Sequence, residues 1–336
     1  MKLNRRLLAP KRWTPPPAPP DQGRTAATHT FDISRRIPSG GEGPKDVIFD
    51  EAGLILAGLE DGNVVRIDPV SGSRTVVGNT GGRPMGLEPS HDGAVLICDY
   101  EKGLLRMSAD GYVEVLVDNI AGTPLIFSSN VVETPDGTIW FTVSTRRWGR
   151  EHYLGEFYEH SCTGLLVKRD PDGTVTVVRD DLKFANGLVL APDASYLLFA
   201  ESAGYRISRY WLTGPNADTV ESFADNLAGL PDSMSLGTDQ LVWVGIVAPR
   251  SALLDAFLPR PGFLRTLLWN LPSTARPAAA SFAWVMAFDL RGRVVHDLRN
   301  DSDSYDFVTS AAENNGIVIA ASQFATDILQ IALPTA

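Results

Sequence analysis

Short apolar runs alternate with tight-turn signals over most of the chain. The runs are rich in β-branched and aromatic side chains, as in Leu54 to Leu59, Thr138 to Val143 and Tyr196 to Ala200. Runs of about five or six residues with this composition are typical of strands in antiparallel meanders. No long helical period interrupts them before residue 250, so the pattern predicts an all-β protein.

Glycine-containing pairs stand between the runs. Asp-Gly and Asn-Gly tolerate the positive φ angles of tight hairpins, so each pair predicts two antiparallel strands that meet. The pairs are Asp61-Gly62, Asp92-Gly93, Asp110-Gly111, Asp136-Gly137 and Asp172-Gly173, joined by Arg291-Gly292 and Asn315-Gly316.

A larger unit of apolar strands and turns ends in a more polar strand and then repeats. It begins at six places, which are Gly43-Pro44, Arg83-Pro84, Ser129-Asn130, Ala185-Asn186, Pro231-Asp232 and near Thr309. Six four-stranded blades around a channel account for this repeat, because radial repetition leaves few exposed sheet edges. We therefore predict a six-bladed β-propeller over residues 28–336, preceded by an extended, proline-rich arm over residues 1–27.

The sixth unit lacks a strand of its own, because Ile317 to Ala321 and Ile328 to Leu333 nearly exhaust the chain. The segment Thr28 to Ile37 is strand-like, and we expect it to supply the missing outer strand and close the ring. Residues 250–283 break the β pattern with apolar side chains spaced by three and four, which predicts two short amphipathic helices. This segment is either a cover on the propeller face or a lid or membrane-facing wall beside a site.

Composition narrows the class of partner and the compartment. The formal net charge of −10 argues against nucleic acid, which requires a basic face. Cys98 and Cys162 are too few for a disulfide framework, and we expect buried thiols or one bridge. The first twenty residues are basic, and their apolar run is too short for a signal peptide or a spanning helix. We expect a cytoplasmic protein, with peripheral membrane contact as an alternative; the oligomeric state stays open.

Several motifs resemble the strictosidine synthase-like family, including the adipocyte plasma membrane-associated proteins, and more distantly the gluconolactonases and paraoxonases. The motifs run in the family's order and include "SSNVVETPDGTIWFTVSTRRW", "LKFANGLVLAPD", "NLAGLPDSMS" and "ENNGIVIAAS". The resemblance implies a propeller with its active site at the mouth of the central channel.

In the metal-binding relatives, the resemblance implies a calcium ion at that mouth, held by a Glu after a Gly-Pro pair and by later Asn or Asp residues. The matching positions here are Lys45, Asn130, Asn186 and Asp232. A hard cation prefers oxygen ligands, and it would polarise a lactone or ester carbonyl. The same residues would otherwise serve as turn formers that hydrogen-bond the backbone at strand entries.

Lys45 departs from that pattern, because it places a cation where the relatives have a carboxylate. Calcium binding is therefore left open by the sequence. The Lys45 ammonium either takes the place of the ion and pairs with Asp232, or points away while Asp46 or Glu201 assists.

Glu313 falls where the alkaloid-forming synthases of the family have their catalytic Glu, so the resemblance implies a general base near Lys45. Its alternative is a structural role beside the turn at Asn315-Gly316. His152 and His160 lie in the loop of the third unit that should overhang the channel mouth, where a histidine would activate water. For both histidines the alternative is a surface or capping role.

The chain holds no G-x-S-x-G elbow, P-loop or H-E-x-x-H motif. Three functions remain. The first is a hydrolase of lactones or esters, with Asp232, Glu313 or His152 moving protons, Lys45, Asn130 and Asn186 binding the substrate, and Asn130, Asn186 and Asp232 holding a metal where one is bound. The second is a metal-free strictosidine synthase-like lyase or condensing enzyme. The third is a non-enzymatic propeller that binds a small-molecule ligand or a partner.

Overall fold

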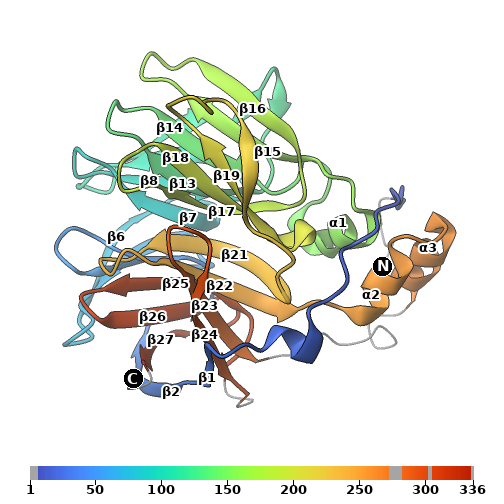
Figure 1. Cartoon of the computed structure of the whole chain (residues 1–336). Helices are drawn as coiled ribbons and strands as arrows, with labels where there is room; N and C mark the ends of the chain where they lie inside the picture. Colours follow the sequence, from blue (N-terminus) through green and yellow to red (C-terminus); the bar gives the residue numbers. More distant parts are fainter. Residues whose placement is uncertain (1–6, 272–281, 302–304, 334–336) are drawn as a thin grey trace.

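The repeat read from the turns forms a ring of six antiparallel sheets arranged as blades (Figure 1). The computed structural model describes residues 7–271, 282–301 and 305–333. The inner strands of consecutive blades contact one another, and β25 of the last blade meets β3 of the first. Each of the six starts inferred from the sequence lies at or beside the beginning of an inner strand, which confirms the six-bladed β-propeller.

The strands of the first four blades follow one another from the inner to the outer edge of each sheet. Blade 1 holds β3 (Val47–Phe49), β4 (Ile55–Gly58), β5 (Asn63–Ile67) and β6 (Arg74–Asn79). Blade 2 holds β7 (Pro84–Pro89), β8 (Val95–Asp99), β9 (Gly103–Met107) and β10 (Val113–Val117). Blade 3 holds β13 (Ser128–Glu133), β14 (Ile139–Val143), β15 (Gly164–Arg169) and β16 (Val175–Leu182). Blade 4 holds β17 (Ala185–Leu190), β18 (Tyr196–Glu201), β19 (Arg206–Trp211) and β20 (Val220–Ala224).

The last two blades each take a strand from the N-terminal part of the chain. Blade 5 holds β21 (Gly229–Leu236), β22 (Val242–Pro249), β23 (Ala283–Phe288) and β24 (Val294–Asn300), and β1 (Thr28–Thr30) adds a parallel fifth strand to its outer edge. Blade 6 holds β25 (Val308–Asn314), β26 (Ile317–Ser322) and β27 (Asp327–Ala332), and β2 (Asp32–Pro38) is its antiparallel outer strand. A two-stranded hairpin, β11 (Asn119–Ile120) with β12 (Thr123–Pro124), lies between blades 2 and 3 in sequence.

The expected ring closure is confirmed in β2, where the register runs from Asp32 opposite Ala332 to Pro38 opposite Asp327. The first part of the same segment, β1, does not join blade 6. It pairs with β24 of blade 5. One N-terminal stretch therefore ties two neighbouring blades. The predicted tight turns also hold their backbone conformation, as at Gly62 (φ 88°) and Gly316 (φ 81°), where a side chain would be strained.

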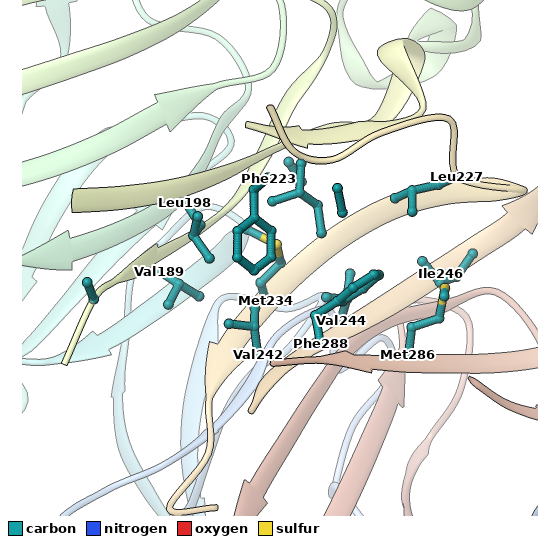
Figure 2. Close-up of a cluster of buried hydrophobic side chains, with 14 of the residues drawn as sticks. Val189, Leu198, Phe223, Leu227, Met234, Val242, Val244, Ile246, Met286 and Phe288 are labelled. Atoms are coloured by element: carbon teal, nitrogen blue, oxygen red, sulfur yellow. The ribbon is translucent and has the colours of Figure 1, made fainter. Parts of the chain in front are cut away.

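The hydrophobic core is divided among the blade interfaces. Each pair of neighbouring blades encloses its own cluster of buried side chains. Figure 2 shows the cluster between blades 4 and 5, in which Phe223 and Leu198 face Val244 and Phe288. Because each fully buried large side chain contributes roughly 1.5–3 kcal/mol, these interfaces stabilise the ring as a whole.

Two connections at the same position of their blades are long and build a cap over one end of the ring. The β14–β15 connection of blade 3 carries a 3₁₀ turn (Arg150–His152) and α1 (Leu154–Glu159). The β22–β23 connection of blade 5 carries α2 (Ala252–Phe257) and α3 (Gly262–Asn270), which matches the two helices expected there. In Figure 1, α2 and α3 project at the right-hand edge, beyond the blades. None of the helices described has the length and apolar character needed to span a bilayer.

The N-terminal arm is extended and lies against this cap. Lys11 N donates to Glu159 O of α1 (2.8 Å), and Arg265 Nη2 of α3 donates to Lys11 O (2.7 Å). Further along the arm, a 3₁₀ turn (Pro20–Gly23) precedes β1, and a third such turn (Ser202–Gly204) follows β18. Both cysteines are free thiols, with Cys98 buried and Cys162 half-buried.

Candidate functional site

The first residues of the inner strands lie close together near the axis of the ring, beneath the cap. Strands β7, β13, β17, β21 and β25 each shift register against their neighbour at this end. Such bulges re-aim side chains and are frequent beside functional sites. Side chains far apart in sequence therefore meet at the capped end of the ring.

Lys45, just before β3, is the centre of this meeting point. Its Nζ lies 2.8 Å from Asp232 Oδ1, 2.8 Å from Ser233 Oγ and 3.3 Å from Asn186 Oδ1. The side chain is 2% exposed, and its three ammonium donors have three acceptors. Of the two orientations considered from the sequence, the structure has the one in which Lys45 pairs with Asp232.

Serine hydroxyls complete the polar floor. Ser129 Oγ donates to Asn186 Oδ1 (2.7 Å), and Asn186 Nδ2 reaches Ser202 Oγ at 3.4 Å. Ser202 Oγ in turn donates to the carbonyl oxygen of Pro231 (2.6 Å). These serines were not recognised in the sequence, although Ser129 stands next to Asn130 in the motif that was.

Asn130 itself has a different position from the one expected. Its Oδ1 accepts a hydrogen bond from Leu188 N of the next blade (3.1 Å), and Ser129 takes the place at the pocket. Asp46 likewise joins neighbouring blades. Its carboxylate accepts hydrogen bonds from Leu87 N of blade 2 (3.0 Å) and from Ser310 Oγ of blade 6 (2.7 Å). After Lys45 and Ser129, therefore, the next residue along the chain joins two inner strands.

Burial dominates the electrostatics of the floor. It raises the pKa of Asp232, and the neighbouring Lys45 ammonium opposes that rise. Burial also raises the pKa of Asp46, again with Lys45 acting in the other direction. A carboxyl group whose pKa is raised is better suited to accept a proton near neutral pH.

The donor set at this point does not fit a calcium ion. Ca²⁺ takes six to eight oxygen ligands, usually with several carboxylates. Here one carboxylate, Asp232, is already balanced by the Lys45 ammonium, which holds the oxygens of Asp232, Asn186 and Ser233. Over the described residues, no three His, Cys, Asp or Glu side chains are grouped as metal ligands would be.

A cavity of about 860 Å³ lies between this floor and the cap. Its walls include a group of aromatic side chains from blades 2, 3, 4 and 6 and from α1, which are Tyr100, Phe127, Tyr153, Phe157, Phe184, Tyr205 and Phe307. The rings pack against one another, as in the edge-to-face contact of Phe127 with Phe184 at 5.4 Å. Pockets of this size and character are typical of sites for small organic molecules.

Tyr153 is a wall residue whose hydroxyl is influenced by the charge of Asp232 at the floor. Burial and the charge of Asp232 raise the pKa of its hydroxyl to about 12, against a hydrogen bond with Gln323. The hydroxyl is therefore a neutral donor at physiological pH. Tyr153 is the next residue after His152 in sequence. Which of the two faces the pocket depends on the path of the loop, so the sequence alone did not identify the tyrosine.

At the mouth, a carboxylate joins two arginines across the opening. Glu60 of blade 1 pairs with the buried Arg83 (3.1 Å) and with the half-exposed Arg150 from the blade 3 connection. Burial lowers the pKa of Arg83 to about 10, and the Glu60 charge opposes this. The pairs hold the blade 3 connection against blade 1.

The structure does not place Glu313 beside Lys45. Thr309, at the start of β25, donates to Lys45 O (2.6 Å), whereas Glu313 lies four residues further along the strand, about 13 Å away at the usual rise. Its carboxylate accepts from Thr238 Oγ1 (2.9 Å) and Gly316 N (2.6 Å). Glu313 thus occupies the turn-adjacent, structural position.

The two candidate histidines are also placed away from the floor. Neither occurs among the described residues that line the cavity. His152 packs edge-to-face on Trp269 of α3 (6.4 Å), and His160 stacks on Trp13 of the arm (4.3 Å). Both rings join the parts of the cap, and burial lowers the pKa of His160 to about 3.

Comparison with known proteins gives consistent results. Residues 130–215 match the family described as strictosidine synthase, and residues 34–67 match its strictosidine synthase-like N-terminal family. Strictosidine synthase-like 7 of Arabidopsis thaliana is 34% identical over 67% of this chain and 61% of its own. The adipocyte plasma membrane-associated protein of Salmo salar is 32% identical over 65% of this chain and 58% of its own.

The matched region is thus less than two thirds of either relative. Among solved structures, a gluconolactonase from Xanthomonas campestris superimposes with a TM-score of 0.66, at 15% identity, over 91% of this chain and 95% of that one. At this level of identity the likeness shows the propeller fold.

Proposed function

The chain belongs to the strictosidine synthase-like family, and on this premise we propose that it is a small-molecule enzyme acting at the floor of the capped pocket. The reaction class we propose is the hydrolysis of a lactone or an ester. The observation that carries the proposal is the buried Lys45 ammonium, held by Asp232, Asn186 and Ser233 under a pocket of about 860 Å³.

The floor supplies the two groups that such a reaction requires. When water attacks a carbonyl carbon, negative charge develops on the carbonyl oxygen, and the Lys45 ammonium stabilises it strongly in a site of low dielectric. Asp232 accepts the proton of the attacking water. The bond to the leaving oxygen then breaks, and that oxygen takes the proton from Asp232.

Neighbouring polar groups orient the reactants. Asn186 is fixed by Ser129 and Lys45 through its Oδ1, and its Nδ2 lies 3.4 Å from Ser202 Oγ, so it keeps the ammonium of Lys45 oriented at the floor. Tyr153 contributes a neutral hydroxyl from the wall, because the pKa of this group is raised to about 12. The aromatic walls exclude water from the reacting atoms.

We propose further that the reaction proceeds without a divalent cation. The Lys45 ammonium supplies the positive charge that a metal ion would bring, and it needs no additional ligands to do so. Activity in the presence of a chelator, with no increase on addition of calcium, is the expected behaviour.

A non-enzymatic ligand-binding propeller is the second candidate. It is favoured by the saturation of Lys45, whose three donors all have protein acceptors before any substrate enters. The condensing-enzyme alternative has less support, because Glu313 bonds to Thr238 and Gly316 and not to the floor.

One experiment separates the two candidates. The purified protein is assayed against a panel of alkyl and aryl lactones and esters in EDTA, alongside Lys45→Met, Asp232→Asn and the surface control Lys168→Met. We expect turnover by wild type and by the control, and loss in both floor variants. Binding of panel compounds by calorimetry with no turnover in any buffer would instead support the ligand-binding candidate.

A further inference from the structure

The side of the pocket formed by blade 5 is apolar from the floor to the mouth. Leu230 of β21 lies two residues before Asp232, and Val247 lies on β22, the strand that pairs with β21. Both side chains line the pocket, and the lining continues through Pro249 at the end of β22 to Leu253 of α2. We call Leu230, Val247, Pro249 and Leu253 the apolar strip.

Two polar residues follow Pro249 in the lining, but their side chains are already bonded within the cap. Arg250 pairs with Asp255 (2.8 Å) and donates to Asn226 Oδ1 (2.7 Å). Ser251 Oγ accepts a hydrogen bond from Leu254 N (3.2 Å) at the start of α2. A ligand with many hydroxyl groups along this side would lose hydrogen bonds with water and gain few in return. The strip is therefore suited to an apolar group.

The mouth itself carries exposed apolar side chains from three connections of the ring. Leu253 of α2 is 39% exposed, Leu154 of α1 is 46% exposed, and Phe324 of the β26–β27 connection is 68% exposed. All three line the pocket, and the ring of Phe324 packs on that of Phe307 at 4.9 Å. Single exposed apolar side chains are normal on a protein surface, but several at one opening indicate that a ligand covers them.

We propose that the pocket takes an ester or lactone that carries an extended alkyl chain, and that Leu253 and Phe324 determine the chain length it prefers. The carbonyl group lies at Lys45 and Asp232, and the chain runs along the apolar strip to the mouth. The place of the carbonyl group rests on the proposed function, whereas the place of the chain rests on the strip. A sugar lactone is a poor substrate on this account, because the strip offers its hydroxyl groups no free side-chain partners.

The ligand class is tested by binding without reaction. Calorimetry is carried out with methyl ketones whose alkyl chain grows from ethyl to octyl, because a ketone carries the carbonyl group but cannot be hydrolysed. Burial of each added methylene is expected to increase the affinity about fourfold until the chain reaches the mouth. An affinity that does not change with chain length would overturn the proposal.

The role of the mouth is tested with Leu253→Gln and Phe324→Gln, which replace side chains outside the core. Each is expected to lower the ratio of octyl to ethyl ketone affinity at least about fourfold, the effect of one methylene. The matched control is Leu267→Gln on α3, because Leu267 is 61% exposed and is not among the described residues that line the pocket. An unchanged ratio in both mouth variants, or an equal loss in the control, would refute this role.

A second measurement separates this inference from the proposed hydrolysis. Turnover of ethyl esters from acetate to octanoate is compared with turnover of glucono-δ-lactone. We expect kcat/KM to rise with the length of the acyl chain and the sugar lactone to be the poorest substrate. Chain-dependent binding of ketones without turnover of any ester would support the ligand class and refute the hydrolysis. Turnover without a chain-length preference, or a preference for the sugar lactone, would support the hydrolysis and overturn this inference.

Discussion

The ammonium of Lys45 and the carboxylate of Asp232 form a buried ion pair with an Nζ–Oδ1 distance of 2.8 Å, although the residues are 187 positions apart in sequence. The pair joins the inner strand of blade 1 to that of blade 5 across the axis. Because both charges are withdrawn from water, each depends on the other.

Breaking this pair should destabilise the fold. Lys45→Met leaves the Asp232 carboxylate buried without its partner, which typically costs about 3–5 kcal/mol. Removing both charges in Lys45→Met with Asp232→Leu should recover much of that loss, because no uncompensated charge remains. Urea unfolding at neutral pH measures both. Lys168→Met, at a partly exposed pair, should change stability by less than about 1 kcal/mol, and a similar loss there would contradict the prediction.

Restoring a carboxylate at position 45 should create affinity for calcium. Lys45→Glu puts a second carboxylate beside Asp232, Asn186 and Ser233, and their oxygens are then released from the ammonium. The variant should melt at a higher temperature when Ca²⁺ is added, whereas the melting temperature of wild type should not change. Isothermal titration gives the affinity, and a wild-type protein that binds calcium at this site would refute our account of the donor set.

The N-terminal strands should matter more for stability than the arm does. A variant lacking residues 1–38 loses β1 and β2, so the outer edges of blades 5 and 6 are left unpaired and the ring is open. A variant lacking residues 1–24 keeps both strands and loses the contacts of the arm with the cap, together with a few others such as that of Pro17 O with Asn226. Thermal unfolding should show a large drop for the first deletion and a smaller one for the second. Equal melting temperatures for the longer deletion and wild type would count against closure by β2.

His160 should make stability depend on pH in the acidic range. Burial, with Lys183, Arg265 and Lys11 nearby, lowers the pKa of His160 to about 3 from its usual 6.5. The unfolded chain therefore binds a proton that the folded chain does not, and stability should fall as pH drops from about 6.5 toward 3.

The variant His160→Asn removes this titration and keeps a residue that tolerates the left-handed backbone there (φ 56°). Its urea midpoint should be lower at neutral pH, because stacking on Trp13 is lost, but it should change less between pH 7.5 and pH 5. The exposed His91→Asn serves as the control. A pH dependence identical to wild type would show that other groups are responsible.

The repeat and the ring could be read from the sequence because their signals are local. A turn at Asp61-Gly62 or Asn315-Gly316 depends on backbone preferences of two residues, and a strand depends on a short apolar run. The six inner-strand starts follow from these signals alone. The need of the last blade for a strand from elsewhere is a matter of counting, so β2 was also predictable.

These local signals do not predict how far along the channel axis a side chain lies or in which direction it points. Glu313 lies on β25, the strand that was expected to carry it, but four residues further along the strand than Thr309, which contacts Lys45. The distance of a residue from the floor depends on where its strand begins, and the sequence does not give that point. Ser129 and not Asn130 faces the pocket because β13 shifts register between Ser128 and Val131 as β17 does between Ala185 and Leu188, which places Ser129 at the position that Asn186 has in its own strand.

The sequence by itself therefore determined the all-β repeat, the six blades, the two cap helices and three of the polar residues at the floor, Lys45, Asn186 and Asp232. Only the tertiary structure decided that Lys45 pairs with Asp232, that Ser129 faces the pocket, and that the arm meets α3. The physical reason is that turns and strands depend on interactions between near neighbours in sequence. A site at the axis depends instead on the register of several strands that the ring brings together.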